Sequence, residues 1–537
     1  MFQDRMTVEK PWFRVWPEGV PRTLEYPVMP LFGLLSEAAE KWPGSTAFGC
    51  GQHSLTYRQM DEATDRLAGG LYDQGVRGGD RVLLLLANSL DFVVSYYGIL
   101  RAGATAVTLN PLSRQAELRH VLSDTGATCL ITCSDHCPVV QQGRAGTSLR
   151  TIILTDGGGG EGIVDLRCML ENDRSSPPRF SVRPEEDVAV VVYTGGTTGM
   201  PKGVMLTHRN LVANAMQNSA WFGWSRDDTI VAVLPFYHSW GGCTGLISPL
   251  FSGARVVIVT RFDASGVLAT IERERATVMY GAASMFASLL DSPAITDYDL
   301  SSLRYVKSGA MPVPEEIRVR WERMTGVSMV LGYGLSEASP ETHNSPLGRV
   351  KAGTIGIPVI DTEARIVDQE SGESELPAGQ TGELIIKGPQ VMKGYLNRLD
   401  ETRETLRNGW LYTGDLGVMD EEGYFRILDR KKETIKYKGY TIAPAEVEAI
   451  LYEHSAVREC AVVGRPDVVA GEVPRAYVVL KDGCRATAAE LIEFCAERIS
   501  PHKRIREVEF IQEIPKTPVG KLLRRVLRDR ARAGHAR

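Results

Sequence analysis

Residues 193–204 (YTGGTTGMPKGV) combine glycines, threonines and one lysine, and they directly follow the apolar run 188–192. Glycines let backbone N–H groups come close to an anion, while hydroxyl groups and a mobile ammonium add donors and positive charge. This composition predicts a phosphate-binding loop, with a plain flexible turn as the alternative. A Walker A loop is excluded because that motif needs Gly-Lys-Ser/Thr, whereas Lys202 follows Pro201 and precedes Gly203.

Four further motifs follow this loop along the chain: residues 331–337 (LGYGLSE), 412–415 (YTGD), 428–432 (LDRKK) and 516–521 (KTPVGK). Together with the loop, they resemble the signature motifs of the adenylate-forming superfamily. That superfamily holds acyl-CoA synthetases, aryl-CoA ligases, luciferases and the adenylation domains of peptide synthetases. The resemblance spans nearly the whole chain and implies an acyl-CoA synthetase or fatty-acid–CoA ligase. Such an enzyme uses ATP to form an acyl-adenylate and then transfers the acyl group to coenzyme A, releasing AMP and pyrophosphate.

The resemblance assigns ATP and Mg²⁺ to particular side chains. Glu337 offers the hard carboxylate oxygen that Mg²⁺ prefers, with the hydroxyl of Thr197 or Thr198 nearby, so the expected metal ligands are Thr198 and Glu337. Tyr333 would stack on the adenine, and an aromatic core residue is the alternative. The ATP- and AMP-binding residues implied by the resemblance are Thr194, Gly195, Gly196, Thr197, Thr198, Lys202, Gly309, Ala310, Met311, Gly332, Tyr333, Gly334, Ser336, Asp415, Arg430, Lys432 and Lys436.

Asp415 and Arg430 are expected at the ribose. Asp415 carries two acceptors for paired ribose hydroxyls, and Arg430 supplies donors to the same sugar. A structural salt bridge is the alternative for both residues. Two positions depart from the family's pattern: Gly195 stands where Ser or Thr is usual, and Ser336 replaces Thr but keeps a hydroxyl. Neither departure removes a group that adenylation needs.

Lys521 is the expected catalytic lysine. Attack of a carboxylate on the α-phosphate brings two anions together, and a fixed ammonium stabilises the charge that builds up; a solvated lysine is the alternative. The resemblance also implies that the C-terminal domain rotates after adenylation, at or beside Lys432. Lys438 and Gly439 would then lie near the pantetheine of coenzyme A. Arg261 would contact the phosphates of coenzyme A or simply lie on the surface.

His238 resembles the position that adjoins the substrate carboxylate in this family, and it joins Lys521 and Glu337 as a catalytic candidate. A neutral core histidine is the alternative. The pocket for the acyl group is expected within residues 237–242, 280–284, 309 and 338–343, above all at Tyr237, Trp240, Gly241, Gly281 and Ala282.

The small residues of these segments suggest room for an alkyl chain or a ring, and we favour a medium- or long-chain fatty acid. An amino acid is disfavoured because its ammonium needs an acidic partner, and Asp263 lies in a separate Arg-Phe-Asp segment. Three alternatives stay open: an aryl or alicyclic acid, transfer to a carrier protein, and a non-catalytic nucleotide-binding homologue.

The chain that positions these motifs alternates helical patterns with short apolar runs, such as residues 81–86, 106–109, 255–259 and 277–280. This alternation predicts an α/β fold with largely parallel sheets. Residues 353–394 carry short strands between Gly, Pro and Ser turns, which predicts a small β-rich subdomain. We expect a large N-terminal domain over residues 1–430 and a small mobile α/β C-terminal domain over residues 431–537, with the catalytic lysine on the latter.

Composition limits the remaining choices. A length of 537 residues exceeds what one hydrophobic core usually supports, and a net charge of −5 gives no drive toward nucleic acid. The arginine-rich residues 524–537 are predicted to be a solvated helix end. Residues 128–133 have the alternation of a half-buried strand with Cys129 and Cys133 on one face, and we do not assign a metal there.

The setting expected from the sequence is the cytoplasm. Residues 1–16 lack the apolar core of a signal peptide, and nine cysteines in so long a chain do not form a disulfide framework. Residues 82–109 are interrupted by Asn88, Asp91 and Arg101, so they predict a buried helix with flanking strands rather than a bilayer span. The expected partners are the acid, ATP and coenzyme A, with a peripheral membrane contact left open and a monomer or homodimer as the assembly.

Overall fold

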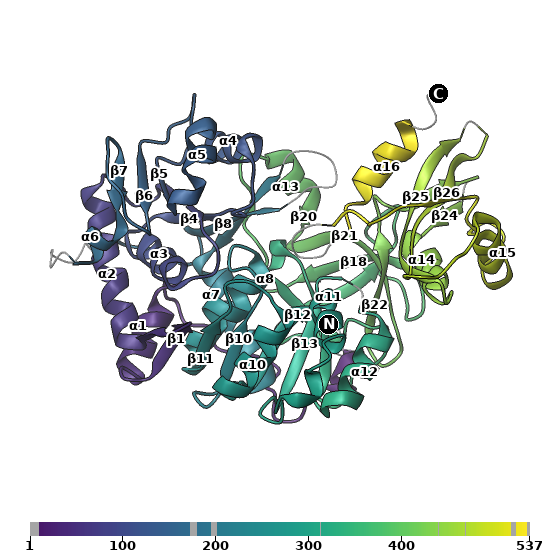
Figure 1. Ribbon diagram of the computed structural model, residues 1–537, viewed down its shortest axis with the longest axis horizontal. Helices are drawn as coiled ribbons and strands as arrows, with labels where there is room; N and C mark the ends of the chain where they lie inside the picture. The colour runs from purple at the N-terminus through teal and green to yellow at the C-terminus, as the bar shows by residue number, and fades with distance from the viewer. Residues whose placement is uncertain are drawn as a thin grey trace, which may run out of the picture. The chain divides into compact units, whose positions relative to one another are not determined.

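The structure is a computed structural model that describes residues 10–171, 180–194, 201–311, 313–438, 440–467, 469–516 and 522–533. The chain divides into two units (Figure 1). The large unit comprises Trp12–Glu363 and Ile386–Leu411, and the small unit comprises Ala364–Ile385 and Tyr412–Arg537 together with Met1–Pro11. The predicted domain boundary near residue 430 therefore falls inside the small unit, where it stays a prediction.

The first sheet of the large unit has, within the described residues, the strand order β19-β9-β8-β4-β3-β5-β6-β7. Strands β8, β4, β3, β5, β6 and β7 run parallel, whereas β9 pairs antiparallel with β8. The strands are β3 (Arg81–Leu85), β4 (Thr105–Thr108), β5 (Cys129–Thr132), β6 (Thr151–Leu154), β7 (Ile163–Asp165), β8 (Val188–Thr194), β9 (Lys202–Thr207) and β19 (Gly394–Tyr395).

Strand β5 of this sheet is more deeply buried than its sequence predicted. Every residue of β5 is buried, although the alternation of residues 128–133 predicted a half-buried strand. The physical reason is that a parallel sheet is covered by helices on both faces, so polar and apolar positions are equally enclosed. Thr132 adapts by donating its hydroxyl hydrogen to the backbone oxygen of Leu85 at 2.8 Å.

The second sheet of the large unit has the order β16-β15-β14-β13-β12-β10-β11-β1-β2 among the described strands. Its central strands run parallel, as βαβ crossovers require. The strands are β1 (Thr46–Cys50), β2 (His53–Thr56), β10 (Thr229–Ala232), β11 (Arg255–Ile258), β12 (Val278–Ala282), β13 (Tyr305–Gly309), β14 (Met329–Gly334), β15 (Glu341–Asn344) and β16 (Ile357–Pro358).

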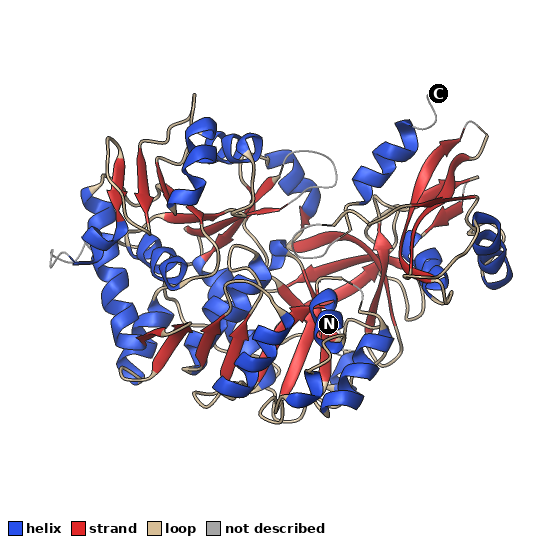
Figure 2. Cartoon of the chain, in the orientation of Figure 1, coloured by secondary structure: helices blue, strands red, loops and turns tan. Residues whose placement is uncertain are grey.

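Helices cover the faces of these two sheets (Figure 2). Among the described residues, no helix is long and apolar enough to cross a membrane. The helices are α1 (Gly33–Lys41), α2 (Tyr57–Asp73), α3 (Leu90–Arg101), α4 (Gln115–Thr125), α5 (Cys137–Gly143), α6 (Leu166–Glu171), α7 (His208–Phe222), α8 (Ser239–Gly242), α9 (Ser248–Ser252), α10 (Ala264–Glu274), α11 (Ala283–Leu290), α12 (Glu315–Thr325) and α13 (Leu399–Thr405). A π-helical turn, Cys243–Ile247, joins α8 to α9.

The predicted helix within residues 82–109 is confirmed as α3, flanked by β3 and β4. Ser89 begins α3, because its hydroxyl accepts a hydrogen bond from the backbone N–H of Phe92 at 3.1 Å. Thr207 and Asn210 begin α7 with a reciprocal capping box. This cap places α7 directly after β9, the strand that follows the predicted phosphate-binding loop.

Two small sheets complete the structure. The first has the order β17-β18-β21-β20, with β22 paired to β21, and the second has the order β24-β23-β26-β25, with β27 paired to β26. Their elements are β17 (Glu363–Val367), β18 (Gly382–Lys387), β20 (Leu406–Arg407), β21 (Trp410–Met419), β22 (Phe425–Arg430), β23 (Ile435–Tyr437), β24 (Tyr440–Ile442), β25 (Val457–Asp467), β26 (Gly471–Leu480), β27 (Glu507–Phe510), α14 (Pro444–Tyr452), α15 (Ala488–Arg498) and α16 (Arg524–Ala533).

Candidate active site

The strands on either side of the predicted phosphate-binding loop are antiparallel neighbours. Thr194 is the last residue of β8, Lys202 is the first residue of β9, and the two are paired across the ladder. The strand pair therefore fixes both ends of the loop. The loop residues Gly195, Gly196, Thr197 and Thr198 lie outside the described residues.

Tyr395 connects the loop lysine to the candidate metal ligand. Its hydroxyl donates a hydrogen bond to Oε1 of Glu337 at 2.8 Å, and its ring centroid lies 5.3 Å from Nζ of Lys202. Lys202 also forms an ion pair with Glu401. Strand β19 holds Tyr395 opposite Val204 of β9. A lysine suited to phosphate and a carboxylate suited to a divalent cation thus lie on either side of one tyrosine.

A contact between two hydroxyls joins the predicted adenine motif to the predicted acyl pocket. The Oγ atoms of Ser239 and Ser336 are 2.9 Å apart, and both side chains are buried. Ser336 directly precedes Glu337, and Ser239 directly follows His238. The segment predicted to bind the acid and the segment predicted to bind the nucleotide therefore meet at these two serines.

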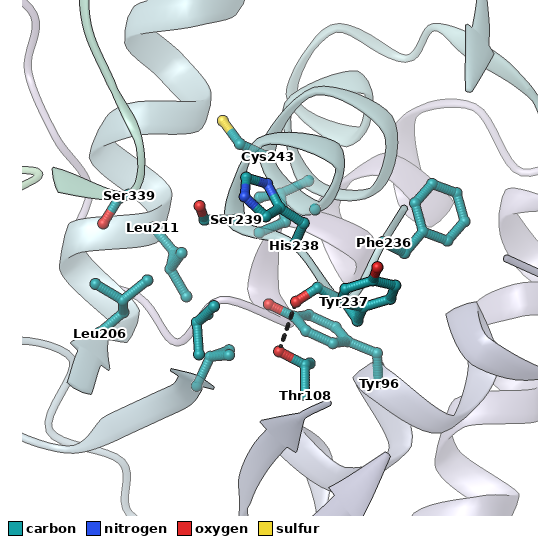
Figure 3. Close-up of a pocket in the computed structure, with 14 residues that line it drawn as sticks. Tyr96, Thr108, Leu206, Leu211, Phe236, Tyr237, His238, Ser239, Cys243 and Ser339 are labelled. Carbon is teal, nitrogen blue, oxygen red and sulfur yellow. Dashed lines mark hydrogen bonds between the residues drawn. The ribbon is translucent and has the colours of Figure 1, made fainter. Parts of the chain in front are cut away.

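A pocket lies beside this contact (Figure 3). Strands β8 and β9 and helix α7 supply apolar side chains, and helix α3 and the segment before α8 supply aromatic ones. Figure 3 shows the imidazole of His238 among these residues. The residues that line the pocket are Tyr96, Thr108, Val190, Val192, Leu206, Leu211, Phe236, Tyr237, His238, Ser239, Gly242, Cys243, Ile247 and Ser339.

His238 has a defined hydrogen-bonding role at the start of α8. Its Nδ1 accepts a hydrogen bond from the backbone N–H of Trp240 at 3.2 Å. In a neutral imidazole, acceptance at Nδ1 assigns the proton to Nε2, which makes Nε2 a hydrogen-bond donor. The neighbouring Tyr237 is also fixed, because its backbone oxygen accepts from the hydroxyl of Thr108 at 3.0 Å. Burial raises the pKa of Tyr237 to about 12, so its phenol stays protonated at neutral pH.

The glycines expected to make room for the acid have a different structural reason. A Cβ on Gly241 would lie 2.2 Å from the backbone oxygen of Pro235, and a Cβ on Gly281 would lie 3.1 Å from the ring of Phe286. At Gly241 the backbone leaves no room for a Cβ, whereas at Gly281 the ring of Phe286 would have to shift by a few tenths of an ångström. Gly242, by contrast, does line the pocket.

A buried ion pair and aromatic rings occupy the region of Trp240 and β12. Nζ of Lys307 lies 2.5 Å from Oε1 of Glu341 and 5.1 Å from the ring centroid of Tyr280. The rings of Trp240 and Tyr280 are 6.3 Å apart. Burial lowers the pKa of Lys307. A Cβ on Gly332 would lie 2.5 Å from Cε of Lys307, so this glycine of the predicted adenine motif leaves space for the lysine chain.

In the small unit, Asp415 and Arg430 form the salt bridge that the sequence left open as an alternative. They face each other across β21 and β22, and Nε of Arg430 lies 2.6 Å from Oδ1 of Asp415. The Asp415 side chain is buried, whereas that of Arg430 is more than one-third exposed. The bridge itself does not decide whether these groups bind ribose, so that role stays a prediction.

The comparison with known proteins decides the family. Residues 35–396 match the AMP-binding enzyme family, and residues 446–521 match the C-terminal domain of AMP-binding enzymes. The chain belongs to this family. Its predicted membership of the acyl-CoA synthetase branch of the adenylate-forming superfamily is confirmed, and so is the predicted α/β fold.

Three similar proteins span most of this AMP-binding enzyme. A long-chain-fatty-acid–CoA ligase from Bacillus subtilis is 38% identical over 99% of this chain and 100% of its own length. A 4-coumarate–CoA ligase from Narcissus pseudonarcissus is 37% identical over 89% of each chain. The crystal structure of the anthranilate CoA ligase AuaEII with anthranoyl-AMP matches with a TM-score of 0.88 and 29% identity, covering 96% of this chain and 99% of that one.

The other residues predicted for the nucleotide lie near the ends of strands. Gly309 ends β13, followed by Ala310 with φ of 65° and by Met311. Gly332, Tyr333 and Gly334 end β14, and the ring of Tyr333 meets that of His343 edge-on at 5.9 Å. Parallel sheets bind ligands at the carboxyl ends of their strands, so this placement agrees with the prediction without testing it.

The residues predicted for domain rotation and coenzyme A are largely exposed. Lys432 lies in the turn after β22, and Arg261 lies in the loop before α10. Lys436, which was predicted for the nucleotide, lies exposed in β23. Lys438 has φ of 48°, and its N–H donates to the backbone oxygen of Ala470 at 2.8 Å. Gly439 and the predicted catalytic lysine, Lys521, lie outside the described residues. Asp263 caps α10 by accepting from the N–H of Gly266.

Sequence reasoning missed several groups of this AMP-binding enzyme. Tyr395 follows a glycine in a segment without a motif, and nothing local marked it as a neighbour of Glu337. Val190 was predicted only as part of the apolar run 188–192, and Leu206 was not singled out. The expectation of a solvated helix end was wrong for Arg524, whose side chain is only 12% exposed and meets carboxylates. The spacing of Leu527 and Ala531, four residues apart in α16, could have indicated that one face of this helix is packed.

Proposed function

We propose that this enzyme activates a long-chain fatty acid with ATP and joins it to coenzyme A. In the first step, a carboxylate oxygen of the acid forms a bond to the α-phosphorus and pyrophosphate leaves. In the second step, the sulfur of coenzyme A forms a bond to the acyl carbon, the bond from that carbon to the AMP oxygen breaks, and AMP leaves. The thiol proton passes to solvent or to a base. The two steps together consume ATP and release AMP and pyrophosphate.

The arrangement around Tyr395 supports the roles proposed for the first step. Lys202 would bind a phosphate group of ATP, and Glu337 would hold Mg²⁺ with the phosphates and water as further ligands. The residues fit this ion, because Mg²⁺ in phosphate sites takes only one or two carboxylates from the protein. When bound, the ion neutralises phosphate charge. The hydroxyl of Tyr395, 2.8 Å from Oε1 of Glu337, would hold the carboxylate in one orientation.

His238 and Lys521 are proposed to act on the acid. Nε2 of His238 would donate to the substrate carboxylate and orient it, since Nδ1 is engaged by the backbone N–H of Trp240. Lys521 would stabilise the charge that develops as the carboxylate attacks the α-phosphate. Asp415 and Arg430 are proposed to bind the ribose, which requires their salt bridge to share its donors and acceptors with the sugar.

The second step is proposed to follow a rotation about Lys432 that brings Lys438 and Gly439 to the pantetheine. Arg261 would bind a phosphate of coenzyme A. The exposure of Lys432 and Arg261 supports these roles, because a hinge must move freely and a phosphate must reach its partner. Free coenzyme A and the cytoplasm, where ATP and coenzyme A are available, belong to the same proposal.

The relatives named long-chain-fatty-acid–CoA ligases carry the choice of acid, and the apolar side of the pocket beside His238 agrees with it. Its walls from β8, β9 and α7 are Val190, Val192, Leu206 and Leu211, which offer an alkyl chain only apolar contacts. Burial of each methylene contributes about 0.8 kcal/mol. A hydrocarbon tail that entered here would leave its carboxylate at His238 and Ser239, beside the nucleotide motif.

An aryl acid is the second candidate, because the Narcissus relative is named a 4-coumarate–CoA ligase. A screen of pyrophosphate release over fatty acids of graded length, benzoates and cinnamates distinguishes the two, with mass spectrometry of the coenzyme A products. We expect the long-chain acids to give the highest kcat/KM, by about tenfold or more over the aryl acids. Preference for a cinnamate or benzoate would contradict the proposed acid while leaving adenylation intact.

A further inference from the structure

Arg524 lies in a buried cluster of carboxylates within the small unit. Nη2 of Arg524 lies 2.5 Å from Oε2 of Glu448, and Nη1 lies 2.8 Å from Oε2 of Glu433. Nη1 also lies 3.8 Å from Oδ1 of Asp429. All these side chains are at most 12% exposed. One guanidinium is therefore shared by carboxylates from the end of β22, the turn after it, and α14.

The position of Arg524 in its helix makes this cluster unusual. Arg524 is the first residue of α16, where the helix dipole disfavours a positive charge. The neighbouring Arg525 and Val526 are exposed, which is the ordinary place for an arginine. Burying one arginine among several carboxylates leaves an excess of negative charge and costs desolvation. The cluster is thus not the arrangement that stability alone would favour.

Arg524 also lies at the base of the segment that carries Lys521. Lys516 and Leu522 form an antiparallel bridge, and the N–H of Leu523 donates to the backbone oxygen of Pro515 at 2.9 Å. These contacts join the two ends of the KTPVGK motif. Arg524 is the next residue, and its side chain joins this base to the carboxylates, beside the apolar packing of Leu522 and Leu527.

The other side of the cluster is the segment proposed to rotate. The backbone oxygen of Arg430 accepts from the N–H groups of Glu433 and Thr434, which closes a tight turn around Lys432. Glu433 and Asp429 lie on either side of that turn, and Asp429 additionally accepts from the N–H of Ala445 at the start of α14. Arg524 therefore bridges the base of the lysine segment to both sides of the turn.

We propose that Arg524 is a positioning residue that ties the catalytic-lysine segment to the hinge turn through Glu433 and Asp429. This inference rests on the proposed function. When the tie is intact, the base of the lysine segment has a fixed place relative to the turn, and Lys521 reaches the α-phosphate in the adenylation step. When the ion pairs of Arg524 are removed, the lysine segment is no longer held in this position and adenylation slows. Thiol attack on a finished acyl-adenylate does not need Lys521, so that step is not slowed.

The test compares the two half-reactions in one preparation of each variant. Adenylation is measured as exchange of pyrophosphate into ATP, and thiol transfer is measured as acyl-CoA formation from supplied acyl-adenylate. The ratio of the two rates does not depend on the fraction of folded protein. The variants are Arg524→Gln and Glu433→Gln; the second removes one excess negative charge and keeps the pair of Arg524 with Glu448, so it is expected to fold. Arg525→Gln, exposed on the same helix, is the matched control.

We expect the ratio of adenylation to thiol transfer to fall about tenfold or more in Arg524→Gln and Glu433→Gln, because small misplacements of a catalytic group have effects of this size. The loss should lie in kcat, with the KM for ATP little changed, and Arg524→Lys should restore part of it. Arg525→Gln should keep the parent's ratio. A ratio within about threefold of the parent's in both cluster variants would overturn the inference. A parent enzyme without either half-reaction would instead overturn the proposed function.

Discussion

At the scale of single residues, Tyr395 is the contact that the motifs did not predict. It lies in β19, far along the chain from both Lys202 and Glu337, and the pairing of β19 with β9 and the hydrogen bond from the N–H of Met392 to the backbone oxygen of Glu337 bring the three together. The motif residues themselves could be predicted because their types and spacing carry chemistry. Tyr395 could not, because its role depends on a strand pairing that no local pattern encodes.

Replacing Tyr395 with Phe should lower adenylation. The change removes the hydroxyl that donates to Glu337 but keeps the ring beside Lys202. A hydrogen bond to a charged group contributes about 1.5–3 kcal/mol, so we expect a decrease of about tenfold in kcat for pyrophosphate exchange and weaker dependence on Mg²⁺. Tyr298→Phe, in the same unit and distant from the motifs in sequence, is the control. An unchanged rate and unchanged Mg²⁺ dependence would remove Tyr395 from the account.

At the scale of elements, α8 shows that the structural role of a residue is harder to predict than the site at which it lies. Sequence reasoning placed residues 237–242 at the acyl pocket, and Tyr237, His238, Ser239 and Gly242 do line a pocket. The glycines were expected to provide space. Gly241 instead accommodates the backbone oxygen of Pro235, a contact that depends on how α8 turns back on the segment before it.

Gly241→Ala should therefore lower the stability of the large unit much more than Gly242→Ala does. A Cβ at residue 241 would meet a backbone oxygen at 2.2 Å, whereas one at residue 242 would meet the backbone oxygen of Phe236 at 3.1 Å. We expect Gly241→Ala to destabilise the large unit by about 3 kcal/mol or more, as overpacking against rigid backbone does, and Gly242→Ala to cost clearly less. Calorimetric Tm values measure this. Equal Tm values for the two variants would show that α8 can shift without cost.

The cluster at Arg524 also makes the free energy of unfolding depend on pH, through Asp429. Burial, opposed by Arg524 from α16 and by the N–H groups of Ala445 and Arg430, raises the pKa of Asp429 from 3.8 to about 6, and Glu448 from α14 adds to the increase. The folded state therefore binds this proton more tightly than the unfolded state does. For this group, the free energy of unfolding is highest below pH 4, falls as the pH rises to about 6, and is constant above.

Asp429→Asn should remove this dependence and keep an acceptor for the N–H of Ala445. We expect the variant to be more stable than the parent at neutral pH by about 1–3 kcal/mol, with the difference disappearing near pH 4. Thermal unfolding of both proteins across this pH range measures the difference. A variant that is less stable than the parent at pH 7 would contradict a raised pKa.

At the scale of the whole molecule, the sequence predicted the class of fold but not its detailed order. Alternating helical and apolar runs predicted parallel sheets, and both large sheets confirm it. The order of strands could not be predicted, because β8 and β4 are neighbours although β5, β6 and β7 lie between them in sequence. The small unit gathers residues 364–385 with residues 412–537, a grouping that packing decides and composition does not show.

The most direct test of the central claim follows one oxygen atom. The enzyme is given a long-chain fatty acid whose carboxylate carries a heavy oxygen isotope, together with ATP, Mg²⁺ and coenzyme A, and the products are weighed by mass spectrometry. If the carboxylate attacks the α-phosphate and the thiol then attacks the acyl carbon, one labelled oxygen passes from the acid to AMP and none passes to pyrophosphate. Unlabelled AMP beside labelled phosphate or pyrophosphate, or no acyl-CoA at all, would contradict activation through an acyl-adenylate.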